Sequence, residues 1–260
     1  MQRLLMIFCC SIVGLTSCNE QVDEEKTKVK KELKQLVPDY KDASYYESEI
    51  LKIDNRDDLT EAKSLTYVDN DGTTYNSTAL VNDKMQIVKL ISKKTKSDGQ
   101  DIEIHHYFLG VSRLASIKIA QKYTETDCFT TETRTYYNDK GKACFSAVRI
   151  GNAKKPYAKN EYKTCDKLDL NPQLAFDIIN QEGKFQTNFL GFNEVNDKIY
   201  ITVGTDFYNA SLVIPGYIDL LKTLKNNETK YLNKPLKVEF KEVMEPNGFS
   251  YQALLDIKIL

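Results

Sequence analysis

The sequence predicts an α+β protein that is built mostly from antiparallel strands. Between residues 64 and 150, short β-branched and aromatic runs alternate with clusters of turn residues, as in an antiparallel meander. From residue 183 onward the pattern changes to strand, strand, strand, helix, strand, strand. The hydrophobic content of 41% is ordinary for a globular protein, and the chain is long enough for two modest cores.

The expected organisation has five parts. Residues 1–17 are a secretory signal, and residues 18–39 are a charged tether. Residues 40–170 form the meander domain, residues 171–182 a connecting helix, and residues 183–260 the second domain.

The N-terminal segment has the layout of an exported protein. One basic residue, Arg3, precedes an apolar stretch from Leu4 to Val13, which is too short to span a bilayer. The sequence Leu15-Thr16-Ser17-Cys18 follows, and it resembles the lipobox of a bacterial lipoprotein. The resemblance implies cleavage before Cys18 and acylation of this cysteine by palmitate-like chains, which hold the protein on the membrane. An ordinary signal peptide, with Cys18 near the cut by chance, is the alternative.

The tether is acidic from Asn19 to Glu25 and rich in lysine from Lys26 to Lys34. Its thin apolar stripe allows either a helix that ends at Pro38 or a disordered segment. An acidic run behind a lipidated cysteine also resembles the signals that move some Gram-negative lipoproteins to the cell surface. We therefore expect a protein of the cell envelope, anchored by lipid in the outer membrane on its periplasmic or surface side.

Turns in the meander domain are expected where Asn or Asp is combined with a glycine that can adopt a positive φ. The three such sequences are Asp69-Asn70-Asp71-Gly72, Ser97-Asp98-Gly99 and Asn138-Asp139-Lys140-Gly141. Paired aromatic residues, Tyr107-Phe108 and Tyr136-Tyr137, precede turns in two segments that resemble each other. Since strand side chains alternate, one ring of each pair faces each side of the sheet. We expect the outer ring to pack beneath a loop; a ligand platform is the alternative.

In the connecting helix, Asn171 is the expected N-cap, Pro172 occupies the first turn, and the apolar stripe ends before Gly183. The strands of the second domain are expected over Phe185–Val195, Lys198–Val203, Phe207–Ile214, Leu236–Lys241 and Phe249–Ile259. The helix between the third and fourth strands is expected from the apolar stripe of Tyr217, Leu220, Leu221 and Leu224. In the last strand, alternation places Leu255 on the buried face and Lys258 on the opposite face. This order of elements is that of an OB-like unit, and an open sheet covered by one helix fits it as well.

Cys128, Cys144 and Cys165 remain after the anchor, because Cys9 and Cys10 leave with the signal. The exported setting is oxidising, so one disulfide is expected and one thiol is left over. If the hairpins turn where expected, Cys144 comes close to Cys165, which makes these two residues the candidate pair. A register slip of one or two residues would change this choice.

The sequence contains no recognised catalytic motif. Its two histidines, His105 and His106, are adjacent in an expected strand and face opposite ways, so they cannot hold one metal together. The acidic clusters around Asp54 and around Asp69 could bind calcium only weakly, and a plain turn suits Asp69 and Asp71 better. We therefore expect no catalytic residue, no metal and no cofactor.

Removal of residues 1–17 takes away Arg3 and leaves 35 basic and 37 acidic side chains. Such a balance argues against electrostatic binding of nucleic acid. We expect a noncatalytic binding or structural lipoprotein whose partner is an envelope protein or a glycan. The absence of tryptophan makes a sugar platform less favourable, although tyrosine can replace it. The alternative is an envelope enzyme or enzyme inhibitor whose site is dispersed along the chain.

Overall fold

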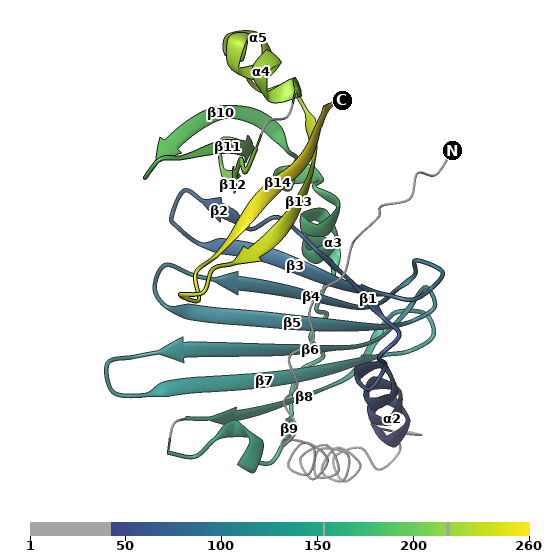
Figure 1. The fold of residues 1–260 in the computed structure, drawn as a ribbon. Helices are drawn as coiled ribbons and strands as arrows, with labels where there is room; N and C mark the ends of the chain where they lie inside the picture. The colour runs from purple at the N-terminus through teal and green to yellow at the C-terminus, as the bar shows by residue number, and fades with distance from the viewer. Residues whose placement is uncertain (1–42, 153, 217–218) are drawn as a thin grey trace. The chain divides into compact units, whose positions relative to one another are not determined.

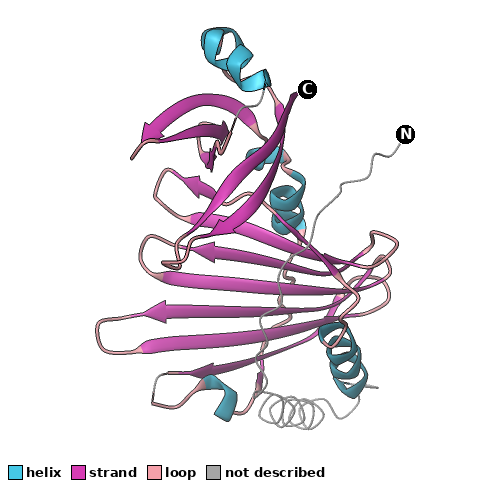
Figure 2. Ribbon diagram, in the orientation of Figure 1, coloured by secondary structure: helices cyan, strands magenta, loops and turns pink. Residues whose placement is uncertain are grey.

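The computed structural model describes residues 43–152, 154–216 and 219–260. It consists mostly of antiparallel strands with a few short helices, which confirms the predicted α+β class (Figures 1 and 2). The chain divides into two compact units that interleave along the sequence. Among the described residues, the first unit comprises 43–62, 79–91 and 102–171, and the second comprises 63–78, 92–101 and 172–260. The sequence had suggested two consecutive domains, 40–170 and 183–260.

The first unit is an antiparallel meander with one helix on it. Its elements are α2 (Ala43–Asp54), β1 (Thr60–Lys63), β4 (Ile87–Thr95), β5 (Gln100–Leu109), β6 (Ser112–Tyr123), β7 (Cys128–Tyr137), β8 (Ala143–Gly151), the 3-10 helix η1 (Tyr157–Lys159) and β9 (Lys163–Thr164). From β4 to β9, each strand lies beside the next one along the chain. The turns between β4 and β5 and between β7 and β8 lie where they were predicted, with φ of +79° at Gly99 and +71° at Gly141.

The core of the first unit lies between α2 and the sheet. Ile50 and Ile53 of the helix pack with Tyr107 and Tyr136 of the strands. Tyr137 follows Tyr136 and points to the opposite face, where its hydroxyl accepts a hydrogen bond from the Leu170 N–H at 3.0 Å. Both rings are buried, so the expectation that the outer ring packs beneath a loop is confirmed for Tyr137.

The second unit combines strands and short helices from distant parts of the chain. Its elements are β2 (Tyr67–Asp69), β3 (Thr74–Val81), α3 (Gln173–Asn180), the 3-10 helix η2 (Gly183–Phe185), β10 (Asn188–Val195), β11 (Lys198–Gly204), β12 (Tyr208–Val213), α4 (Asp219–Asn226), α5 (Glu228–Tyr231), β13 (Leu236–Met244) and β14 (Ser250–Ile259). The predicted turn between β2 and β3 is also present, with φ of +81° at Gly72. The last residues of β3 belong to the first unit, and β4 and β5 each contribute residues to both units.

The strands from β10 to β14 have a defined pairing. Strands β10, β11 and β12 form an antiparallel meander, and β13 and β14 form a hairpin. Strand β14 runs parallel to β12, with Val213 opposite Ala253, and β2 pairs with β12 in the antiparallel sense. Asn188 of β10 forms an antiparallel bridge with Pro235, which precedes β13.

The core of the second unit draws on residues that lie far apart in the sequence. Leu65, Tyr67 and Tyr75 are buried against Phe185 and Phe189. The Tyr67 hydroxyl donates a hydrogen bond to the Phe185 carbonyl oxygen at 2.8 Å. The segment that carries β2 and β3 is therefore part of this core.

The connecting helix is shorter than expected. It begins at Gln173, with Pro172 at the N-cap position, and no side chain caps its first turn. Asn171 is therefore not the N-cap, which corrects the sequence-based expectation. Ala175 and Ile178 form its buried stripe as predicted.

The predicted alternation of the last strand is wrong at Leu254 and Leu255, whereas Ile257 is buried and Lys258 is exposed as predicted. Glu239 lies opposite Asp256 and Phe240 lies opposite Leu254, so Leu255 is an extra residue in a β-bulge. The bulge interrupts the alternation, and Leu254 is 1% exposed whereas Leu255 is 50% exposed. Regular alternation had placed Leu255 in the core.

Several sequence-based expectations lie outside the described residues. These are the signal of residues 1–17, the lipidated Cys18, the tether of residues 18–39 and Tyr217 at the start of the helical stripe. Within the described ranges, no helix has both the length and the apolar character that crossing a membrane requires.

The bulge in β14 leads to a prediction about stability. Leu254→Asp would bury a carboxylate among apolar side chains and should cost more than about 4 kcal/mol of unfolding free energy. Leu255→Asp is the matched control, because Leu255 is half exposed and the new carboxylate would reach solvent, and it should change stability by less than about 0.5 kcal/mol. Urea denaturation followed by circular dichroism measures both. Equal losses in the two variants would contradict the bulge.

Candidate functional site

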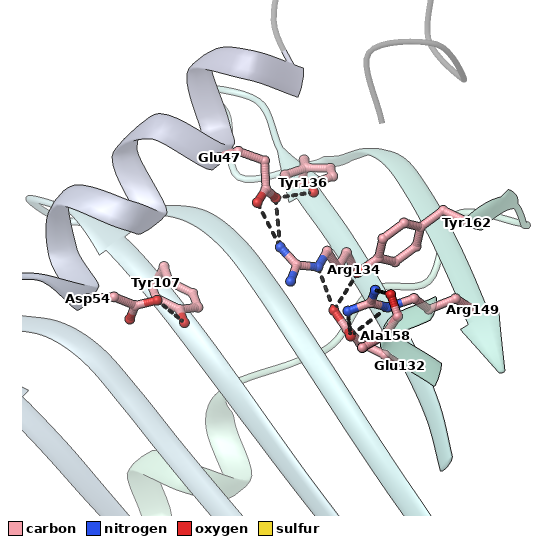
Figure 3. A network of polar contacts seen from close by, with 9 residues as sticks. All are labelled: Glu47, Asp54, Tyr107, Glu132, Arg134, Tyr136, Arg149, Ala158 and Tyr162. Atoms are coloured by element: carbon pink, nitrogen blue, oxygen red, sulfur yellow. Dashed lines mark hydrogen bonds and ion pairs between the residues drawn. The ribbon is translucent and has the colours of Figure 1, made fainter. Parts of the chain in front are cut away.

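A cluster of buried charges in the first unit is the most conspicuous polar site of the described residues (Figure 3). Glu132, Arg134 and Tyr136 occupy alternate positions of β7, so their side chains point to one face of the sheet. Arg149 of β8 lies directly opposite Glu132. Glu47 approaches the same face from α2.

The two carboxylates hold the cluster together. Glu132 accepts hydrogen bonds from Arg134 Nε at 2.6 Å and from Arg149 Nη2 at 2.7 Å, and the Tyr162 hydroxyl donates to it at 2.7 Å. Glu47 accepts two hydrogen bonds from Arg134 Nη1, at 2.8 and 2.9 Å. The Tyr136 hydroxyl donates to Glu47 at 2.5 Å. Arg134 therefore joins the helix to the sheet.

Burial and charge in this cluster oppose each other. Glu132 is 2% exposed and Arg149 is 3% exposed. Burial alone would raise the pKa of Glu132, but Arg134, Arg149 and the Tyr162 hydroxyl outweigh burial and lower this pKa below its usual value. Burial, followed by the charge of Glu47, raises the pKa of Tyr136, so this residue keeps its proton and remains a donor. Two carboxylates face two guanidinium groups, so each charge of the cluster has a partner of opposite sign and each of these side chains is held by hydrogen bonds.

A smaller polar contact joins the end of α2 to the sheet. The Asp54 carboxylate accepts a hydrogen bond from Lys89 Nζ at 2.7 Å and another from the Tyr107 hydroxyl at 3.3 Å. The Lys89 ammonium also lies 4.8 Å from the centre of the Tyr107 ring. The helix is thus attached near its beginning by Glu47 and at its last residue by Asp54.

The acidic residues that were considered for calcium binding have structural contacts. Asp58 accepts hydrogen bonds from the Arg56 side chain at 2.7 and 2.8 Å. Asp69 accepts hydrogen bonds from the Thr73 N–H and the Tyr75 hydroxyl, each at 3.0 Å, as expected of a plain turn. Among the described residues, no three His, Cys, Asp or Glu side chains are arranged to hold a metal ion.

The two histidines face opposite ways, as predicted. His106 is 1% exposed, and its Nδ1 forms a 2.8 Å hydrogen bond with the hydroxyl of Ser116. Burial lowers the pKa of His106 to about 4, so the ring is neutral at physiological pH. His105 lies on the other face and contacts the Glu103 carboxylate.

Cys128, Cys144 and Cys165 are free thiols in the structure. The Cys165 N–H donates to the Ser146 carbonyl oxygen at 3.1 Å, so Cys165 lies beside Ser146 where the sequence-based register had placed it near Cys144. Cys144 is the extra residue of a second β-bulge, since Tyr136 pairs with Phe145 and Tyr137 with Ala143. Its Sγ donates to the Tyr136 carbonyl oxygen at 3.1 Å. The expected Cys144–Cys165 bond is therefore absent, because the bulge directs the thiol of Cys144 to another partner.

Sequence reasoning did not single out Glu47, Glu132, Arg134 or Arg149. One signal was available for two of them. Glu132 and Arg134 share the face of the buried Tyr136 in a predicted strand, and charged residues on a core face require partners. The partners themselves could not be named, because Glu47 lies 87 residues from Arg134 in the sequence.

Comparison of the chain with models of protein families found no match, and no curated protein or solved structure matches it either.

The charge cluster predicts that Glu47 supports stability. Glu47→Gln removes the negative charge that faces the largely buried Arg134 and should cost about 3 kcal/mol of unfolding free energy. Glu49→Gln is a control on the same helix, because Glu49 pairs with the exposed Lys52 and should leave stability nearly unchanged. Chemical denaturation of both variants at neutral pH is the measurement. A loss of similar size in the control would show that any substitution in α2 lowers the unfolding free energy, whether or not it breaks the ion pair between Glu47 and Arg134.

The buried His106 predicts a dependence of stability on pH. Its pKa falls from about 6.5 in the unfolded chain to about 4 in the folded protein, so the unfolded state takes up the proton first as pH falls. This contribution is complete above pH ~6.5 and is lost as the pH falls toward ~4. Between pH 7 and 4.5 the protein should lose about 2–3 kcal/mol more stability than His106→Asn, whose amide can still reach Ser116. Parallel stability curves for the two proteins would refute this assignment.

Proposed function

We propose that this protein is a lipid-anchored, noncatalytic binding or structural module of the cell envelope. The observation that carries the noncatalytic role is the use of the buried charged groups. Glu47, Glu132, Arg134 and Arg149 are all occupied in attaching α2 and in joining β7 to β8. Groups that are held in this way support a rigid scaffold, and a scaffold presents its surfaces to partners.

The lipid anchor is proposed from the sequence Leu15-Thr16-Ser17-Cys18 and the apolar segment before it. Cleavage before Cys18 and acylation would place the charged tether between the membrane and α2. The outer membrane is the proposed location, with the protein on its periplasmic or surface side. The proposed partners are an envelope protein or a glycan.

We further propose that β10 to β14 form an OB-like unit. The antiparallel meander β10-β11-β12, the helices before β13 and the parallel contact of β12 with β14 support this proposal. The bridge between Asn188 and Pro235 supports it as well, since it brings the first and fourth strands of the unit together. OB-like units commonly serve as binding modules, which agrees with the proposed role.

The anchor proposal predicts the effect of one substitution. Cys18→Ala removes the acylated thiol and should move the protein from the membrane fraction to the soluble fraction. The melting temperature should stay the same, because the described cores begin beyond the tether. Cys128→Ala is the control and should remain with the membrane. If Cys18→Ala stays in the membrane fraction after a high-salt wash, the anchor lies elsewhere.

A further inference from the structure

The face of β6 to β9 that points away from α2 carries lysines without acidic partners. Since Glu132, Arg134 and Tyr136 point toward α2, the alternate residues Thr131 and Thr133 lie on the other face. The register places Lys118, Thr133, Val148 and Lys163 side by side across the four strands.

Two further rows of the same face follow from the register of the strands. Ala120, Thr131 and Ile150 lie side by side, and Lys122 lies opposite Phe129. Phe129 is 45% exposed and Ile150 is 57% exposed. We call the surface formed by Lys118, Lys122, Lys163, Phe129, Thr131 and Ile150 the basic face.

Within the strands that form it, the basic face carries no acidic side chain. Glu132 is the only acidic residue in β6, β7, β8 and β9, and its carboxylate is engaged on the opposite side of the sheet by Arg134 and Arg149. Within the described residues, Lys118, Lys122 and Lys163 form no ion pair. The buried cluster behind them pairs two carboxylates with two guanidinium groups, so it does not neutralise them.

The spacing of the lysines indicates a ligand with repeated negative charges. Lys118 and Lys122 are roughly 13 Å apart along β6, because a strand rises about 3.3 Å per residue. Lys118 and Lys163 are separated by three strand spacings, which is roughly 14 Å. Strand side chains stand roughly perpendicular to the sheet, so the ammonium groups remain spread out and a single small anion cannot contact all three.

The surroundings of the lysines favour a polysaccharide over a bilayer. The Thr131 hydroxyl between the lysines can donate to and accept from sugar hydroxyls, and Phe129 offers a ring at the rim. The β6–β7 turn beside this rim carries Glu125 and Asp127. A flat anionic membrane would meet these carboxylates together with the lysines, whereas a polysaccharide chain can lie across the strands from Lys118 to Lys163 and avoid the turn. We propose that the basic face binds an anionic polysaccharide that carries carboxylate, sulfate or phosphate groups.

This inference assigns a ligand class to the proposed binding function and rests on it. The test uses the Cys18→Ala chain, so its result does not depend on lipid anchoring. Binding of polygalacturonate, dextran sulfate and neutral dextran is measured by calorimetry at low and at physiological salt. The protein should bind at least one charged polymer and not neutral dextran, and the affinity should fall as salt rises.

A triple variant, Lys118→Gln with Lys122→Gln and Lys163→Gln, should weaken this binding by about tenfold or more. The matched control, Lys222→Gln with Lys225→Gln and Lys237→Gln, removes the same charge from exposed positions of the second unit and should retain affinity within about twofold. Thermal unfolding of both variants verifies that the fold is intact. Because the substituted side chains of the basic face form no ion pair, their loss should not alter the melting temperature.

Three results would overturn the proposal. The first is equal loss of affinity in the two triple variants, which would indicate an effect of overall charge. The second is binding to phosphatidylglycerol vesicles with no binding to either charged polysaccharide, which would indicate a membrane surface. The third is no binding to any of these polymers, which would show that an anionic polysaccharide is not the ligand. The lipid anchor and the scaffold role would be unaffected, because separate experiments test them.

Discussion

The carboxylate of Glu132 lies at the centre of the contacts that organise the first unit. It is almost fully buried, and two guanidinium groups and one tyrosine hydroxyl stabilise its charge. Through Arg134 the same network reaches Glu47 and fixes α2 on the sheet. Because a buried charge is tolerated only when it is paired, the positions of β7, β8 and α2 are tied to one another.

The two faces of β6 to β9 have different chemistry, and the period of two along a strand separates them. Glu132 and Arg149 point to the buried face, whereas their neighbours Thr131 and Ile150 point to the other one. Along each strand, alternate residues therefore belong to the buried scaffold, and the residues between them belong to the proposed binding surface. A network of paired charges directly behind this surface holds the strands in register and so fixes the spacing of the residues that the surface presents.

The second unit depends on contacts that the order of its strands did not reveal. Leu65, Tyr67 and Tyr75 complete a core that otherwise comes from residues 172–260. A fragment of residues 183–260 would lack these three side chains and would leave that part of the core open to water. The pairing of β2 with β12 has the same origin, because it joins residues about 140 positions apart in the chain.

Local chemistry was sufficient to predict the turns at Gly72, Gly99 and Gly141, the helix that buries Ala175 and Ile178, and the order of β10 to β14. These features depend on residue period and on the conformational preferences of a few neighbouring residues. The bulges at Cys144 and Leu255 could not be predicted, because a bulge is visible only against the register of the paired strand. The partner of Arg134 and the interleaving of the two units depend on contacts between segments that lie far apart in the sequence. No local pattern of residues indicates such contacts, so the sequence alone could not predict them.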